Sequence, residues 1–216
     1  MEGLLRRILE LTPFYHPCRS WWHKRKQSYE VLKWEKNGRP VPVPDTIKQR
    51  VLKEYAVKFG LRILVETGTC YGDMVEAMKD AFDTIYSIEL SHTLFSKARQ
   101  RFQKRPNIHI LEGDSANVLG DVVKGIDAPV LFWLDAHYSA GVTAKGENET
   151  PIFDELNSIF HVAPDRGHVI IIDDARCFGK DLGYPTLDEL KEFILAKDRN
   201  LEIAVRDDCI RVTKRK

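Results

Sequence analysis

The stretch Leu61-Arg-Ile-Leu-Val-Glu-Thr-Gly-Thr-Cys-Tyr-Gly72 predicts a buried strand that runs directly into a glycine turn. Residues 63–65 form an uninterrupted apolar run, which is typical of a parallel strand covered on both faces. Gly68 and Gly72 bracket the turn, where the backbone needs positive φ or close approach to a ligand. The free N–H groups of the helix expected next favour a polar ligand at this junction.

Asp73 and Glu76 predict a capping box at the start of that helix. Its expected apolar positions, which recur at helical spacing, are Met74, Val75, Met78, Ala81 and Phe82. A dinucleotide-binding turn requires G-x-G-x-x-G, whereas residues 69–71 separate the two glycines here. The spacing therefore disfavours a pyrophosphate ligand.

From residue 61 onward, strand and helix patterns alternate, which favours βαβ units and a parallel sheet. The other strands are expected at 84–89, 107–111, 129–135 and 168–173, with a terminal hairpin around 201–205 and 210–212. We therefore expect an α/β fold with a Rossmann-like, doubly wound, mostly parallel seven-stranded sheet and a C-terminal antiparallel hairpin. Residues 61–216 would form this domain, and residues 1–60 a helical appendage whose last helix spans about 45–59.

The chain has 33 basic and 32 acidic residues, a net charge of +1, which gives it no overall attraction to nucleic acid or an anionic membrane. Its four cysteines show no C-x-x-C pair, and no apolar run reaches transmembrane length. We expect a reduced, cytoplasmic protein without a signal peptide or membrane span, in which nucleic acid is not the main partner.

The appendage is basic, with seven Lys or Arg residues against two acids between Arg19 and Arg39, and it carries Trp21, Trp22 and Trp34. Aromatic and basic side chains together can bind phosphate, sugar or nucleic acid. The preferred interpretation is that the tryptophans pack the appendage onto the core while the charges face water. A homo-oligomer formed through the appendage is a further alternative.

Acids close the apolar runs of the expected strands, and in doubly wound sheets ligands bind at that carboxyl edge. These acids are Glu66, Glu89, Asp114, Asp135 and Asp173. Glu89 follows Gly68 by the interval at which a carboxylate reaches ribose hydroxyls, so a ribose-bearing cofactor is expected.

The E-x-G-T-x-x-G stretch at residues 66–72 resembles motif I of class I S-adenosylmethionine-dependent methyltransferases. The resemblance implies that Glu66, Gly68, Thr69 and Gly72 hold the methionine part of the cofactor. It further implies ribose binding by Glu89 and adenine binding by Asp114 and Ser115, with Asp135 beside the cofactor. Asp114 or Ser115 can equally cap the following helix.

Asp135, Asp173 and Asp174 resemble the divalent-cation site of metal-dependent O-methyltransferases, which implies Mg²⁺. Alternatively, Asp173 or Asp174 pairs with Arg176 or caps a turn. His137 is the candidate general base, with Asp135 beside it in the catalytic set. Residues 139–149 are small, polar and glycine-punctuated, and we expect a loop over the site.

These features favour methyl transfer to a hydroxyl of a small-molecule or sugar-like acceptor. The Asn/Asp-Pro-Pro-aromatic motif of amino-group methyltransferases is absent after the strand at 129–135. Two alternatives are an NAD- or nucleotide-sugar-binding oxidoreductase and a non-catalytic binding protein that uses the basic Trp-rich appendage.

Deletion of residues 1–40 should leave a folded protein that still binds cofactor but turns over poorly. The segment is too short and too poor in patterned apolar residues to build a core of its own. Circular dichroism of the truncated chain checks that it is folded, and calorimetry checks that it still binds cofactor. A cooperative thermal melt from an isolated fragment 1–45 would contradict the prediction.

Overall fold

The structure, a computed structural model, describes residues 28–135, 151–162, 166–181 and 183–215. The chain divides into two compact units, residues 1–47 and 48–216. The boundary between these units falls inside helix α3 (Asp45–Phe59), and the functional division predicted at residue 61 stays a prediction. The bounds of α3 agree with the helix expected at 45–59.

The described part of the first unit holds a helix over residues 28–36 and the loop that follows it. Trp34 is buried in a small apolar cluster with Val43 and Ile47, and its indole Nε1 donates a hydrogen bond to the Pro40 carbonyl at 2.7 Å. This tryptophan packs inside its own unit. Trp21 and Trp22 lie outside the described residues.

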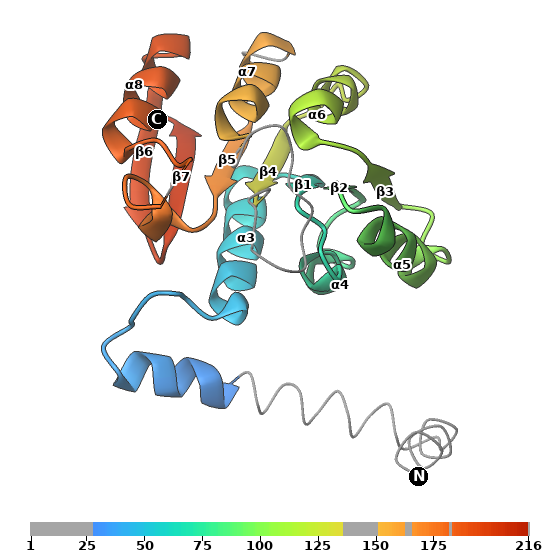
Figure 1. The fold of residues 1–216 in the computed structure, drawn as a ribbon, viewed down its shortest axis with the longest axis horizontal. Helices are drawn as coiled ribbons and strands as arrows, with labels where there is room; N and C mark the ends of the chain where they lie inside the picture. Colours follow the sequence, from blue (N-terminus) through green and yellow to red (C-terminus); the bar gives the residue numbers. More distant parts are fainter. Residues whose placement is uncertain (1–27, 136–150, 163–165, 182, 216) are drawn as a thin grey trace. The chain divides into compact units, whose positions relative to one another are not determined.

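In the described part of the second unit, seven strands form one sheet in the order β3-β2-β1-β4-β5-β7-β6 (Figure 1). The strands are β1 Ile63–Thr67, β2 Thr84–Glu89, β3 Ile108–Glu112, β4 Val130–Leu134, β5 Val169–Ile172, β6 Leu201–Arg206 and β7 Cys209–Lys214. The first five run parallel, and β7 runs antiparallel to both β5 and β6. The predicted mostly parallel sheet with a C-terminal hairpin is confirmed.

Helices cover both faces of this sheet, as a doubly wound fold requires. Besides α3, they are α4 Asp73–Met78, α5 His92–Phe102, α6 Ser115–Lys124, α7 Ile152–Val162 and α8 Leu187–Lys197, and a short 3₁₀ helix, η1, spans Ala175–Cys177. Among the described residues, no helix is both long enough and apolar enough to span a bilayer. Cys70, Cys177 and Cys209 are free thiols.

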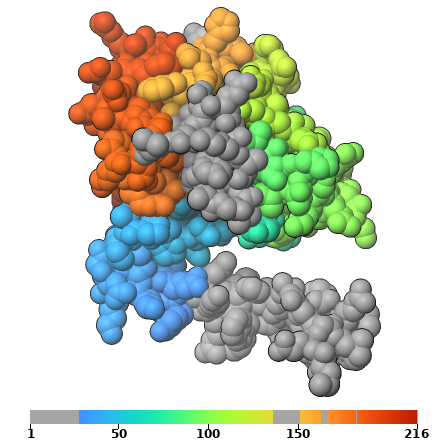
Figure 2. Space-filling model, viewed as in Figure 1, coloured from blue at the N-terminus to red at the C-terminus, as the bar shows by residue number. Residues whose placement is uncertain are grey.

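Strand β4 shows why the predicted continuous apolar runs suit a sheet covered on both faces. Leu131 and Trp133 belong to the apolar cluster under α3, α4 and α5, whereas Phe132 and Leu134 belong to the cluster under α6, α7 and α8. Both sets of helices are visible on opposite sides of the sheet in Figure 1. In the space-filling view, the orange and red C-terminal segments form one flank of this unit and the green β3–α5 region the other (Figure 2). All β4 side chains are thereby withdrawn from water.

Helix α4 differs from the sequence-based expectation at both ends. Gly72 is its N-cap, with φ 75°, and no side chain caps the helix. The Asp73 carboxylate instead accepts a hydrogen bond from Arg101 at 2.8 Å, and Glu76 pairs with Lys79. The capping box predicted at Asp73 and Glu76 is therefore wrong. Gly72 is the N-cap, and both carboxylates form ion pairs with Arg101 or Lys79. The helix also ends at Met78, before the apolar positions predicted at 81 and 82.

Replacing Thr186 with alanine should lower the free energy of unfolding by about 1 kcal/mol. Thr186 forms a capping box with Glu189 at the start of α8, and alanine leaves the Glu189 N–H without its acceptor. Urea unfolding of the full chain measures the change. Thr93→Ala, on the exposed surface of α5, is the matched control and should change stability little. Equal stabilities of the two variants would contradict this prediction.

Candidate functional site at the carboxyl edge of the sheet

Backbone hydrogen bonds join the residues that follow neighbouring strands, so the carboxyl ends of these strands meet at one edge. Each amide just beyond a strand donates to a carbonyl at the end of the next strand. The pairs are Gly68 N to Ile88 O at 3.0 Å, Gly113 N to Glu89 O at 2.9 Å, Asp135 N to Thr67 O at 3.2 Å and Asp173 N to Leu134 O at 3.0 Å. The predicted acids at the strand ends are brought to one edge by this arrangement.

The glycine turn after β1 is fixed by Glu89, at the end of β2. Gly68 and Gly72 have φ of 85° and 75°, as predicted for this turn. The backbone N–H of Cys70 donates to Glu89 Oε2 at 2.7 Å, and Ser91 N–H donates to Glu89 Oε1 at 2.8 Å. This carboxylate therefore links the glycine turn to the start of α5.

Glu66 is a buried carboxyl group beneath the same turn. Its Oε2 accepts a hydrogen bond from Ser87 Oγ at 2.5 Å, and Ser87 Oγ lies 2.6 Å from the hydroxyl of Thr69. Burial, together with repulsion from Asp135 and Glu89, raises the pKa of Glu66 to about 8, although the hydrogen bond from Ser87 acts in the opposite direction. The side chain is therefore mostly protonated at neutral pH. A positive charge placed nearby would favour its ionised form.

Asp114 caps helix α6, as one of the two predicted roles requires. Its Oδ1 accepts from the backbone N–H of Ala116 at 3.0 Å, and Ser115 is buried as the first residue of the helix. A carboxylate has more lone pairs than this single hydrogen bond uses. The cap is thus compatible with the predicted adenine contact, which stays a prediction.

Glu155 on α7 is a buried acid that the sequence analysis did not identify. Burial raises its pKa to about 7, against hydrogen bonds from the hydroxyls of Ser115 and Thr67, while Asp114 and Asp135 raise it further. Within the described residues its Oε1 has no hydrogen-bond partner. Glu155 therefore joins the strand-end acids at the same edge.

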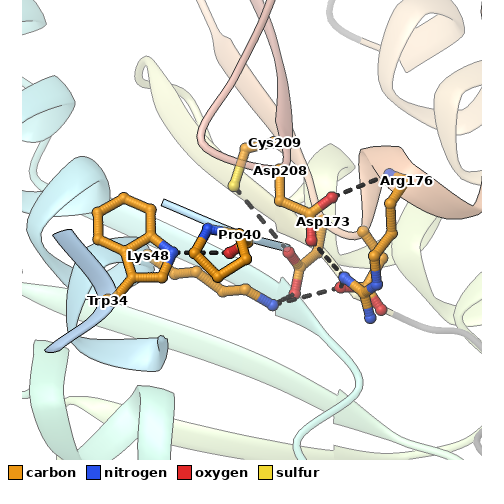
Figure 3. A network of polar contacts seen from close by, with 8 residues as sticks. Trp34, Pro40, Lys48, Asp173, Arg176, Asp208 and Cys209 are labelled. Atoms are coloured by element: carbon orange, nitrogen blue, oxygen red, sulfur yellow. Dashed lines mark hydrogen bonds and ion pairs between the residues drawn. The ribbon is translucent and has the colours of Figure 1, made fainter. Parts of the chain in front are cut away.

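Asp135, Asp173 and Asp174 converge as predicted. Among the described residues they form a group in which one carboxylate oxygen from each lies within 4.8 Å of the others. Lys48 of α3 reaches this group: its ammonium Nζ lies 2.5 Å from Asp173 Oδ2 and 3.3 Å from Asp174 Oδ1 (Figure 3). The strand-end pattern in the sequence does not predict Lys48 at this position.

A second cation, Arg176, contacts the same oxygen of Asp174 as Lys48 does. One guanidinium nitrogen is 2.5 Å from Asp174 Oδ1 and also pairs with the buried Asp208 in the β6–β7 turn (Figure 3). Asp208 Oδ1 accepts a further hydrogen bond from the Arg176 backbone N–H at 2.9 Å. The alternative in which Asp174 pairs with Arg176 is therefore observed. Since Asp173 and Asp174 already contact cations, these residues do not fit a divalent metal as they stand.

Lys48 and Glu155 were missed because they lie on helices, away from the strand-end pattern. The sequence nevertheless contains a signal for each of them, because a charged residue lies among apolar residues on one face of a helix. Lys48 precedes the buried Val51 and Leu52 by one turn, and Glu155 follows the buried Ile152 by three residues. A lysine or glutamate at such a position is rarely buried without a partner.

The predicted general base His137 lies outside the described residues, as does the loop predicted at 139–149. Their roles stay predictions. Asp135 is the last described residue before this segment, and its backbone N–H also donates to Thr67 Oγ1 at 3.2 Å.

Comparison with known proteins identifies the fold. No protein-family model matches the chain, and neither does any curated protein sequence. A methyltransferase from Podospora anserina, solved with S-adenosylhomocysteine, aligns over 87% of this chain and 88% of its own at 17% identity and a TM-score of 0.58. A putative caffeoyl-CoA O-methyltransferase from Staphylococcus aureus aligns over 90% and 96% of the two chains, at 16% identity and a TM-score of 0.55.

The O-methyltransferase of tomaymycin synthesis from Streptomyces achromogenes, solved with S-adenosylmethionine, covers 87% of this chain and 88% of its own at 16% identity and a TM-score of 0.55. This chain has the class I methyltransferase fold. The fold implied by the E-x-G-T-x-x-G stretch is thus confirmed, while identities this low leave the chemistry to be argued from the site.

Replacing Glu66 with glutamine should make stability less sensitive to pH. An acid whose pKa is raised from 4.5 to about 8 in the folded protein keeps a proton that the unfolded chain has released. The free energy of unfolding of the wild type therefore falls as pH rises from the unfolded pKa of 4.5 to the folded pKa of about 8, by up to about 1.4 kcal/mol for each unit of pKa shift. Glutamine stays neutral, so the free energy of unfolding of the variant rises relative to that of the wild type as pH increases from about 5 to about 8.

Urea unfolding at several pH values measures this difference. Glu192→Gln, which removes an exposed acid from α8, is the control and should follow the wild-type curve. If the curve for Glu66→Gln stays parallel to that of the wild type, Glu66 is ionised in the folded protein.

Proposed function

We propose that this protein transfers a methyl group from S-adenosylmethionine to a hydroxyl of a small-molecule or sugar-like acceptor. The observation that carries the proposal is the meeting of Glu66, Glu89 and Asp114 at the carboxyl edge of a class I methyltransferase sheet. Glu66 and Glu89 lie at the ends of β1 and β2, Asp114 follows β3, and the glycine turn lies beside them.

The edge suits a cofactor with a positive centre. S-adenosylmethionine supplies an electrophilic methyl group on a sulfonium cation. Glu66, Gly68, Thr69 and Gly72 would hold its methionine part, because Glu66 is a buried carboxyl that a nearby cation would ionise. The repulsion among the acids in the free protein would fall when the cofactor binds.

The other cofactor roles follow the same proposal. Glu89 would accept hydrogen bonds from the ribose hydroxyls, and Asp114 with Ser115 would contact the adenine ring. Both carboxylates keep unused lone pairs beyond the backbone N–H groups that they already bind.

The acceptor side of the proposal rests on the residues around β4. Asp135 would lie beside the transferred methyl group, and His137 would take the hydroxyl proton as general base. Residues 61–216 would bind the cofactor, and residues 1–60 would contribute to the choice of acceptor.

Other functions have less support from the residues. An oxidoreductase would need the G-x-G-x-x-G turn, which is absent between residues 66 and 73. An rRNA methylase from Streptococcus thermophilus is also similar, over 82% of this chain and 99% of its own at 13% identity and a TM-score of 0.50. The missing amino-group methyltransferase motif after β4 favours a hydroxyl acceptor over a base.

A panel of ligands tests the class of function. Thermal unfolding of the full chain is followed with S-adenosylhomocysteine, NAD⁺ or a short RNA, since a ligand that binds the folded state raises the midpoint. We expect stabilisation by S-adenosylhomocysteine alone. Stabilisation by NAD⁺ without any effect of S-adenosylhomocysteine would overturn the proposal.

Asp114→Asn should weaken binding of S-adenosylhomocysteine by about tenfold without destabilising the protein. Asparagine caps helices as well as aspartate, so its side-chain oxygen keeps the bond from Ala116 N–H. Its amide nitrogen cannot accept from the adenine amino group, and a hydrogen bond to a charged group contributes roughly 1.5–3 kcal/mol. Isothermal titration calorimetry measures the affinity, with Glu192→Gln as control. Unchanged affinity in Asp114→Asn would show that adenine is held elsewhere.

A further inference from the structure

Lys48 is a buried lysine in the middle of an acidic cluster. It is 8% exposed, on the face of α3 that packs against the sheet, and the carboxylates of Asp173 and Asp174 both lie within ion-pair distance of its ammonium group. Burial alone would favour the neutral amine. The carboxylates of Asp173, Asp174 and Asp135 outweigh that effect and raise the pKa of Lys48 above its ordinary value.

The Lys48 ammonium group contacts the carboxylate oxygens that a divalent cation would need as ligands. Mg²⁺ requires carboxylate oxygens at about 2.0–2.1 Å in near-octahedral geometry. Asp173 Oδ2 and Asp174 Oδ1 already accept hydrogen bonds from Lys48 Nζ, at 2.5 and 3.3 Å. A metal ion bound by the same oxygens would bring two positive charges next to a third in a site with little water. Lys48 and a metal therefore compete for the cluster.

Arg176 reinforces this competition. It pairs with Asp174 and with the buried Asp208, so two cations are distributed over the carboxylates of residues 173, 174 and 208. Buried carboxylates are stable when they are paired in this way. Lys48 and Arg176 therefore supply part of the counter-charge of this cluster, although burial and the nearby Asp135 still raise the pKa of Asp173 above its ordinary value.

We propose that the Lys48 ammonium group takes the place of a divalent cation in this cluster, so that the protein works without a metal. Three N–H donors are available on an ammonium group, and among the described residues Asp173 and Asp174 engage two of them. The third is the group that would orient an acceptor oxygen next to Asp135. This last role rests on the proposed methyl transfer, whereas the replacement of the metal does not.

Manganese binding to the full-length protein tests the replacement, because bound Mn²⁺ loses the electron paramagnetic resonance signal of the free ion. The wild type should bind no Mn²⁺ at this cluster. Lys48→Met keeps the length of the apolar stem but removes the charge, and it should bind Mn²⁺ at least about tenfold more tightly than the wild type. Adding Asp173→Asn to Lys48→Met should abolish that binding.

Lys53→Met removes an exposed lysine from the same helix and is the matched control, which should behave as the wild type does. Wild-type binding of Mn²⁺ that Asp173→Asn removes would overturn the proposal, as would a folded Lys48→Met that binds Mn²⁺ no more tightly than the wild type. If Lys48→Met does not fold, the comparison of wild type with Asp173→Asn decides alone: Mn²⁺ binding that depends on Asp173 refutes the proposal, and its absence supports it. Failure of the wild type to bind S-adenosylhomocysteine would refute the proposed function and leave the manganese result standing.

Discussion

The burial of several carboxyl groups at the carboxyl edge of the sheet is the physical constraint on which the rest of the site depends. An ionised carboxylate loses its hydration when it is buried, and neighbouring carboxylates make the loss worse. Glu66, Glu155 and Asp173 are all nearly inaccessible to solvent, at 1%, 1% and 4% exposure. The parallel sheet forces this crowding, because the residues beyond β1, β4 and β5 are joined by backbone hydrogen bonds.

The protein relieves this crowding in two ways. Burial raises the pKa of Glu66 to about 8 and that of Glu155 to about 7, against the hydrogen bonds from neighbouring hydroxyls, so these carboxyls take up a proton near neutral pH. Where a cation can reach, as at Asp173 and Asp174, Lys48 and Arg176 provide the compensating charge. The first arrangement responds to a positively charged ligand by releasing a proton, whereas in the second two protein cations already offset part of the negative charge. The part of the edge around Glu66 and the part around Lys48 therefore differ in how they respond to a charged ligand.

The strands and the strand-end acids could be predicted from the sequence because their signals are local. A run such as residues 129–135 is apolar on both faces, and only a covered strand suits it. Lys48 and Glu155 could not be assigned to the edge, since their partners are set by how helices α3 and α7 pack. Asp73 was misassigned for the same reason: Arg101, from another helix, competes with the local capping pattern.

The Lys48–Asp173 pair joins residues 125 positions apart in the chain, and the Arg176–Asp208 pair adds a bridge over 32 positions. Contacts between such distant residues form only after long loops have closed, so they come late in folding. The hairpin must also insert β7 beside β5 before Asp208 reaches Arg176. A partly folded chain can therefore contain the glycine turn and β1 while the carboxylates of residues 173, 174 and 208 still lack Lys48 and Arg176 as partners.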